Sequence, residues 1–280
     1  LVSTTRKSKV RVKHIMLRTD YETYAVERID DHILMVIMDR PEVANAKNTK
    51  MGLEQKEIFE SLYTDTEGVR CVILTGRGDK AFCAGGDLKE RNGMTDAQWR
   101  YQHAVYEQGV FAVRNCPVPV IAAVNGAAYG GGCETALNAD FVYASSTARF
   151  ALTEVTLGIM PGAMGTQNLP HAVGERRAKE IIFTGTPFTA QDGYEWGLIN
   201  KVCAPEDLIA DTLVTAKKIA SNAPQSIMRA KRSVSVASQV DRSTGYQFEL
   251  EAYNRLVGSK DRLEGVLAFN EKRKANFTGE

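Results

Sequence analysis

The chain has 280 residues and a formal net charge of +1, so its charge gives no reason to expect a nucleic-acid-binding or membrane-surface protein. No apolar run reaches the roughly 18 to 20 residues that a membrane-spanning helix needs. The five cysteines are scattered without a C-x-x-C pair or neighbouring histidines. This excludes a disulfide framework and a zinc site as working hypotheses and favours a reducing compartment.

Residues 1–19 differ in composition from the rest of the chain. They carry six Lys or Arg residues, and no acidic residue precedes Asp20. Such a segment is compatible with a transit peptide, a nucleic-acid-binding arm or a non-native extension before Met16. We expect a basic, disordered extension over residues 1–19.

Residues 20–203 alternate predicted strands with predicted helices. Short apolar runs between turn-forming residues predict strands, and apolar residues three or four positions apart predict helices. Strands are expected at residues 23–29, 33–38, 69–75, 118–124, 139–143, 149–152 and 198–202. Helices are expected at residues 49–63 and 95–113, and a third is expected to begin at Glu134. This order predicts an α/β fold in which helices cover a sheet.

From Met164 onward the pattern is mostly helical. Helices are expected at residues 175–183, 190–196, 206–220, 224–238, 243–258 and 261–275. We therefore divide the chain into the extension, an α/β core at residues 20–203, and a helical region at residues 204–280.

Two glycine-rich loops each follow a predicted buried strand and precede a helix. One contains Gly85 and Gly86, and the other runs from Gly130 to Gly132. Glycines at a helix N-terminus leave backbone N–H groups unpaired and accessible. A plain strand-to-helix turn explains either loop alone. Together they could direct two N–H groups at one oxygen, which would form an oxyanion hole.

Three motifs carry a family resemblance. They are FCAGGDL at residues 82–88, AAVNGAAYGGGCE at residues 122–134 and FALTEVTLGIMPG at residues 150–162. In this order and spacing they closely resemble the crotonase superfamily, the enoyl-CoA hydratase/isomerase family, over about residues 21–277. The resemblance implies a spiral of strand–strand–helix units. It also implies that residues 204–280 form a helical subdomain that supports trimer formation and closes the site.

The same resemblance implies roles for particular residues. Glu134 and Glu154 match the two catalytic glutamates of family hydratases, and Gly86 and Gly131 match the oxyanion-hole glycines. Position alone also allows Glu134 to complement its helix dipole and Glu154 to face solvent. Family precedent makes Glu134 the base for water and Glu154 the donor of the α-proton. The residues that match the loop lining the coenzyme A channel are Ala84, Asp87, Leu88 and Lys89.

Two positions depart from the family pattern. Asn168 stands where many members carry arginine, and Met164 occupies a place that is often glycine. Both adjoin the loop after Glu154, so the shape of the acyl pocket is the property they affect. Arg91 and the basic residues 272–274 are further candidates for contacts with coenzyme A phosphates, without a family match that would make them site residues.

We expect an enoyl-CoA hydratase, most like those that convert a 2-trans-enoyl-CoA to a 3-hydroxyacyl-CoA. Coenzyme A would enter as part of the substrate, with no separate cofactor and no metal. The alternatives are an isomerase, a carnitinyl-CoA-like dehydratase, a cyclic enoyl-CoA hydratase, or a homologue that binds RNA through its basic extension. The resemblance further implies a homotrimer or dimer of trimers, and the expected location is the cytoplasm or the mitochondrial matrix.

Overall fold

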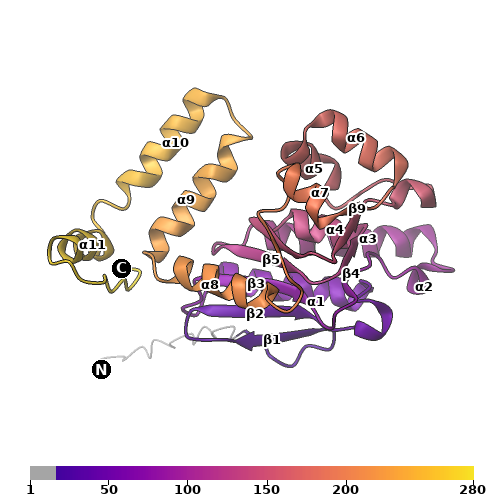
Figure 1. Cartoon of the computed structure of the whole chain (residues 1–280), viewed down its shortest axis with the longest axis horizontal. Helices are drawn as coiled ribbons and strands as arrows, with labels where there is room; N and C mark the ends of the chain where they lie inside the picture. The colour runs from indigo at the N-terminus through magenta and orange to yellow at the C-terminus, as the bar shows by residue number, and fades with distance from the viewer. Residues whose placement is uncertain (1–16) are drawn as a thin grey trace, which may run out of the picture.

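The structure, a computed structural model, describes residues 17–280 (Figure 1). Residues 1–16, which hold most of the predicted extension, lie outside the described residues. The described end of that segment packs against the core. The Leu17 backbone N–H donates to Glu67 over 2.9 Å, and Arg18 pairs with Asp20 and Glu57. Leu17 and Arg18 therefore contact the folded core.

The larger sheet has six strands in the order β1-β2-β3-β5-β7-β10. Only the β1–β2 pair is antiparallel among these strands. The central strands are apolar and buried along their whole length, as expected for parallel strands covered on both faces. The bounds are β1 Tyr24–Arg28, β2 Ile33–Met38, β3 Cys71–Gly76, β5 Val120–Val124, β7 Phe141–Ser145 and β10 Lys201–Cys203.

A second sheet has four short strands in the order β4-β6-β8-β9. They are β4 Ala81–Cys83, β6 Ala127–Tyr129, β8 Arg149–Ala151 and β9 Phe188–Thr189. Strands β4, β6 and β8 directly follow β3, β5 and β7 of the larger sheet, so the chain visits both sheets before each following helical segment. This spiral of strand–strand–helix units confirms the predicted fold class.

Helices α1 Thr49–Thr64 and α3 Asp96–Arg114 pack against each other and cover the core. Both start at side-chain caps, because Asn48 accepts from the backbone of Met51 and Thr95 forms a capping box with Gln98. The shorter helices of the core are α2 Leu88–Arg91, α4 Gly131–Leu137, α5 Gly165–Val173, α6 Glu175–Thr184 and α7 Ala190–Glu195.

Several predicted boundaries were wrong. Helix α4 begins at Gly131, three residues before the predicted start at Glu134, because the glycines themselves form its first turn. The strand predicted at 198–202 is shifted to β10, and the buried Leu198 and Ile199 precede it in a loop. Strands β4 and β6 were not predicted as strands, since three residues are too few to show periodicity.

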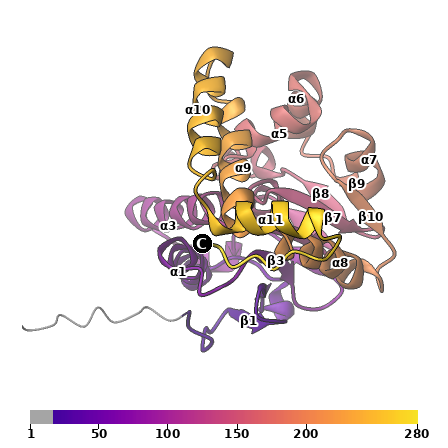
Figure 2. The same ribbon diagram turned by 90° about the vertical axis from the view of Figure 1, so that its left-hand side faces the viewer.

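The C-terminal region has two parts. Helix α8 Leu208–Ala220 packs on the larger sheet. Helices α9 Pro224–Ala237, α10 Arg242–Asn254 and α11 Lys260–Asn270 extend away from both sheets (Figures 1 and 2). Their surface carries large exposed apolar side chains, with Val234 74% and Phe269 84% exposed. No helix in the part of the chain that the structure describes is long and apolar enough to cross a membrane.

Candidate active site

The two glycine loops and both predicted glutamates line one cavity of about 540 Å³. It lies between the end of β4, the start of α4 and the loop after β8. Six of the predicted site residues line it, namely Ala84, Gly86, Leu88, Gly131, Glu134 and Glu154. A larger cavity of about 900 Å³ between α1, α3 and α9 contains none of them. The smaller cavity is therefore the candidate active site.

The glycine loops pack backbone against backbone. A Cβ atom on Gly85, whose φ is +93°, would lie 2.8 Å from the Tyr129 carbonyl oxygen and 3.4 Å from the Gly131 nitrogen. A Cβ on Gly132 would lie 1.9 Å from the Cys83 carbonyl oxygen. No side chain fits at these separations, so the close approach of the two loops requires glycine.

This packing leaves two backbone donors unpaired beside the same cavity. Within residues 17–280, neither the Gly86 N–H nor the Gly131 N–H has a hydrogen-bond partner. Gly131 is the first residue of α4, so the helix dipole adds to the positive electrostatic potential at its N–H group. The arrangement suits an oxygen on which negative charge develops.

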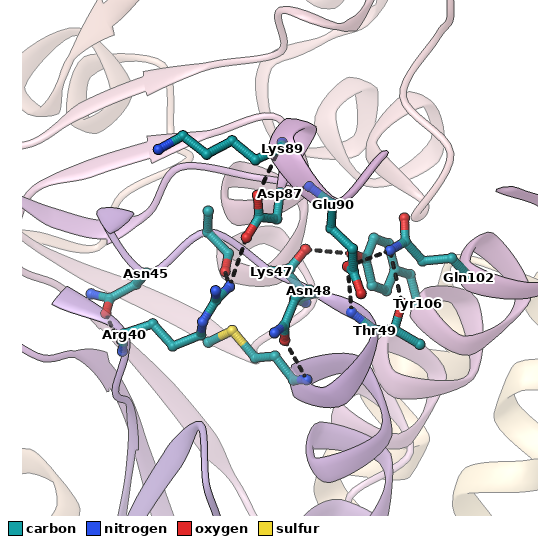
Figure 3. A network of polar contacts seen from close by, with 12 residues as sticks. Arg40, Asn45, Lys47, Asn48, Thr49, Asp87, Lys89, Glu90, Gln102 and Tyr106 are labelled. Atoms are coloured by element: carbon teal, nitrogen blue, oxygen red, sulfur yellow. Dashed lines mark hydrogen bonds and ion pairs between the residues drawn. The ribbon is translucent and has the colours of Figure 1, made fainter. Parts of the chain in front are cut away.

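Asp87 stabilises the first glycine loop from the side that does not line the cavity. Its Oδ1 accepts from the backbone N–H groups of Lys89 and Glu90, which caps α2, and its Oδ2 accepts from Arg40 over 3.0 Å (Figure 3). Although burial acts to raise the pKa of Asp87, the Arg40 hydrogen bond and the capping N–H groups bring it below its usual value. Asp87 thus lies behind the loop, outside the set of residues that line the cavity.

The Lys89 side chain is exposed and extends away from this network (Figure 3). Lys89 also lies outside the residues that line the cavity. Contacts of Asp87 and Lys89 with substrate therefore stay a prediction.

Helix α2 is also tied to α1 and α3. The Glu90 carboxylate accepts from the Thr49 backbone N–H over 2.8 Å and from the Gln102 amide over 2.7 Å (Figure 3). The Gln102 oxygen in turn accepts from the Arg91 Nε over 2.8 Å. The Arg91 guanidinium lies 4.2 Å from the Trp99 ring centroid, a cation–π contact. Arg91 and Trp99 thereby form a fixed part of the cavity wall, and the Arg91 guanidinium gives this part a positive charge.

Glu134 is 3% exposed, and its carboxylate is held by another segment of the chain. Its Oε1 accepts from the backbone N–H groups of Ala163 and Gly165 over 2.8 and 2.9 Å. Burial raises the pKa of Glu134, and these two N–H groups act against that rise. The donors to this carboxylate come from the chain around the start of α5, while the Glu134 N–H itself is paired with the Gly130 carbonyl. One carboxylate oxygen is thus fixed by the chain at the start of α5.

Glu154 begins a short 3₁₀ turn, Glu154–Leu157, and is 9% exposed. Its Oε2 is buried and has no hydrogen-bond partner among the described residues. Burial first, and then the negative charge of Glu134, raises the pKa of Glu154 to about 7. Near neutral pH this carboxyl group can therefore hold a proton, while Glu134 has donors that favour its anion.

Met164 lies between the two N–H groups that hold Glu134. Its φ and ψ are 73° and 6°, in the left-handed region that costs an L-residue about 1–2 kcal/mol. Successive N–H groups around such a residue form a concave site for an anion. Met164 therefore has the backbone conformation that glycine adopts most easily.

This geometry predicts opposite effects for two substitutions of Met164. Met164→Gly is expected to raise the free energy of unfolding by up to about 1 kcal/mol and to preserve the Glu134 contacts. Met164→Val is expected to lower it by about 1 kcal/mol or more, because a β-branched side chain is least tolerated at positive φ. Urea denaturation measures both, with Met164→Ala as the intermediate control. Equal stability of the Gly and Val variants would contradict the backbone explanation.

Asn168, the other departure from the family pattern, connects three helices. It accepts from Arg114 on α3 and donates to Asn138 after α4, each over 2.9 Å. The Asn138 amide then donates to the carbonyl oxygens of Glu134 and Ala163. Asn168 does not line the cavity. It therefore acts on the site through the helices that carry Glu134 and its donors.

Sequence reasoning missed several side chains of the cavity wall. The polar and aromatic side chains of the wall that lie outside the predicted site set include Lys47, Arg91, Trp99, His103 and Tyr106. Among them, the sequence marks only Arg91, as a candidate for contact with coenzyme A phosphates. The others lie on helices or loops whose side-chain direction depends on packing between elements far apart in the chain. No local motif marks them.

Comparison with known proteins assigns the family. The profile of the enoyl-CoA hydratase/isomerase family matches residues 28–280. The short-chain-enoyl-CoA hydratase of Clostridium acetobutylicum is 40% identical over 243 residues, 86% of this chain and 92% of that protein. The crotonyl-CoA hydratase of Syntrophomonas wolfei is 36% identical over 92% of this chain and 98% of its own length. The crystal structure of an enoyl-CoA hydratase from Bacillus anthracis superposes with a TM-score of 0.90 at 42% identity, covering 92% of this chain and 100% of that one.

Proposed function

The chain belongs to the enoyl-CoA hydratase/isomerase family, and on that premise we propose that it adds water to a 2-trans-enoyl-CoA thioester. The product is a 3-hydroxyacyl-CoA. One observation supports this most directly. The unpaired backbone N–H groups of Gly86 and Gly131 line the same cavity as two buried glutamates. Hydration needs each of these four groups.

The two N–H groups form the proposed oxyanion hole. When the water oxygen bonds to the β-carbon, the double-bond electrons move toward the thioester and negative charge develops on its oxygen. Donors fixed at that position lower the barrier by about 2.7–4 kcal/mol each. Because Gly86 and Gly131 have no side chains and their N–H groups are unpaired, these donors are available to the substrate.

The glutamates divide the proton transfers. In our proposal the Glu134 carboxylate takes the proton from the attacking water, and the Glu154 carboxyl group gives its proton to the α-carbon. The raised pKa of Glu154, about 7, supports the role of proton donor. The two N–H groups on Glu134 support the role of base. The two transfers balance, since one group gains a proton as the other loses one. Turnover is completed when Glu134 gives its proton to solvent water and Glu154 takes one up.

The other expectations remain proposals. Coenzyme A arrives as part of the substrate, so the proposed reaction needs no separate cofactor and no metal. Location in the cytoplasm or the mitochondrial matrix stays a prediction. Contact of residues 1–16 with RNA also stays a prediction, and removal of residues 1–15 tests it through the affinity for RNA and its dependence on salt.

Hydration is tested with a panel of 2-trans-enoyl-CoA thioesters that differ in chain length and ring content. Loss of the enoyl absorbance and formation of a 3-hydroxyacyl-CoA, identified by mass spectrometry, are the expected results with at least one member. Product analysis separates the alternatives. A shifted double bond without any hydroxy product would contradict hydration and favour an isomerase.

We also propose that the chain assembles into a trimer or a dimer of trimers. The exposed apolar side chains of α9–α11, with Tyr253 67% and Leu250 60% exposed, support burial against another copy. Light scattering on a sizing column is expected to give three or six times the chain mass of 30.8 kDa. A single peak at the mass of one chain at micromolar concentration would contradict this assembly.

A further inference from the structure

A buried lysine that the proposed reaction does not use lies beside the oxyanion hole. Lys47 is 3% exposed, and it lines the cavity with both glycine loops. Within the described chain its ammonium group has no carboxylate within ion-pair distance. The ammonium group instead donates to two neutral oxygens and lies 6.0 Å from the centroid of the Tyr106 ring. A buried cation without a carboxylate partner is costly, so its position calls for a reason beyond packing.

The main chain of Lys47 holds the first glycine loop. Its N–H donates to the Gly85 carbonyl over 2.7 Å, and its carbonyl accepts from the Asp87 N–H over 2.8 Å. The Tyr106 hydroxyl donates to the same carbonyl (Figure 3). These bonds fix the residues on both sides of Gly86, and they leave the Gly86 N–H unpaired.

The side chain of Lys47 reaches the second glycine loop. Its Nζ donates to the Thr135 hydroxyl on α4 over 3.1 Å and to Gln55 on α1 over 2.6 Å. The Thr135 hydroxyl donates in turn to the Gly131 carbonyl over 2.7 Å. Hydrogen bonds therefore run from the Gly86 loop through one lysine to the first turn of α4.

We infer that Lys47 is a positioning residue for the oxyanion hole, which sets the Gly86 loop against Gly131 and places a positive charge beside Glu134. This inference rests on the proposed function. The two donors must meet at one oxygen, and a displacement of about 1 Å can cost about 10²-fold in rate. Lys47 contacts both loops through direct or relayed hydrogen bonds, so its loss is expected to change their relative position.

The positive charge of Lys47 has a second effect, on the pKa of Glu134. Burial lowers the pKa of Lys47, while the nearby Cys83 and Glu134 act to raise it. The positive charge of Lys47 acts in turn to lower the pKa of Glu134. Other titratable side chains also act electrostatically with Glu134 from its own helix, from α3 and from the turn after β8, namely Cys133, His103 and Glu154. Removal of the Lys47 charge leaves these groups in place, so it is expected to raise the pKa of Glu134.

Lys47→Met tests both effects. We expect kcat for crotonyl-CoA to fall by about 10²-fold with little change in KM. Because the base must be deprotonated, the acidic limb of the pH profile should move to higher pH. Thermal stability should be equal or higher, since an apolar residue replaces a buried charge. Lys47→Arg should keep the acidic limb near its original pH, because the charge remains.

Thr135→Val separates position from charge. It removes the hydroxyl that links Lys47 to Gly131 and keeps the lysine. We expect a lower kcat and an unshifted acidic limb. Lys231→Met is the matched control, because Lys231 is also a largely buried lysine, 11% exposed, but lies outside the candidate active site and pairs with Asp140. It should retain kcat.

A saturated thioester separates this inference from the proposed reaction. Butyryl-CoA cannot be hydrated, but its carbonyl can bind the oxyanion hole, and polarisation there lowers its infrared stretching frequency. Lys47→Met and Thr135→Val should both reduce this shift. The inference is overturned if both variants keep the shift, kcat and the acidic limb of the parent enzyme. If the parent polarises butyryl-CoA without hydrating enoyl thioesters, the proposed function fails, and the role of Lys47 stands if both variants reduce the shift and falls if both keep it.

Discussion

Replacing Glu134 by Gln is expected to lower kcat for hydration of crotonyl-CoA by about 10²–10⁴-fold, the usual contribution of a general base. A glutamine amide cannot accept the proton of the attacking water. Its oxygen can still accept from the Ala163 and Gly165 N–H groups, so the local structure should persist. KM should change little, because the glycine loops proposed to contact the thioester remain. Steady-state kinetics and thermal unfolding measure the two effects.

The control for this change is Glu195→Gln, on the exposed end of α7, which lies outside the cavity. It should retain the parent kcat. A Glu134→Gln variant with near-normal turnover would show that another group deprotonates the water.

Replacing Glu154 by Gln is expected to cause a loss of similar size, because the α-carbon then has no proton donor. The diagnostic measurement is exchange of the α-hydrogens of butyryl-CoA with D₂O, followed by mass spectrometry. This exchange does not involve water addition. It should be lost in Glu154→Gln and should persist in Glu134→Gln. The reverse pattern would exchange the roles of the two glutamates.

The pKa of Glu154 predicts two pH dependences of opposite sign. Hydration needs the protonated carboxyl group, so its rate should fall as pH rises through about 7. Exchange on butyryl-CoA needs the carboxylate to remove the α-hydrogen, so its rate should rise over the same range. Both dependences should vanish from the residual activity of Glu154→Gln. Hydration that stays constant between pH 6 and about 9 would contradict the role of Glu154 as acid.

Most of the fold could be predicted from local sequence signals. Helix α1 begins at Thr49 and β2 spans Ile33–Met38 as expected, because caps and long apolar runs act over a few residues. Strands β4 and β6 could not be found in this way. Each is only three residues long. The two strands pair with each other although they lie about 45 residues apart in the chain, as the pair Ala81 and Ala127 shows.

The candidate site also has a part that the sequence predicts and a part that it does not. Gly86, Gly131, Glu134 and Glu154 lie in motifs with a readable order, so their presence in one cavity could be expected. The hydrogen-bond partners of these residues could not be predicted from the sequence. The donors to Glu134 lie 29 and 31 positions away, at Ala163 and Gly165. Nothing in the sequence near Lys47 shows that its Nζ reaches Thr135, 88 positions later.

The sequence by itself determined the family, the order of the longer elements and the four groups proposed to act on the substrate, because each is encoded in a short contiguous segment. Only the tertiary structure decided the state of those groups. The pKa of Glu154 depends on burial and on the charge of Glu134, and the pKa of Glu134 depends on burial and on the two N–H groups at the turn around Met164. Solvation and electric fields depend on distances in space, and a one-dimensional pattern does not specify them.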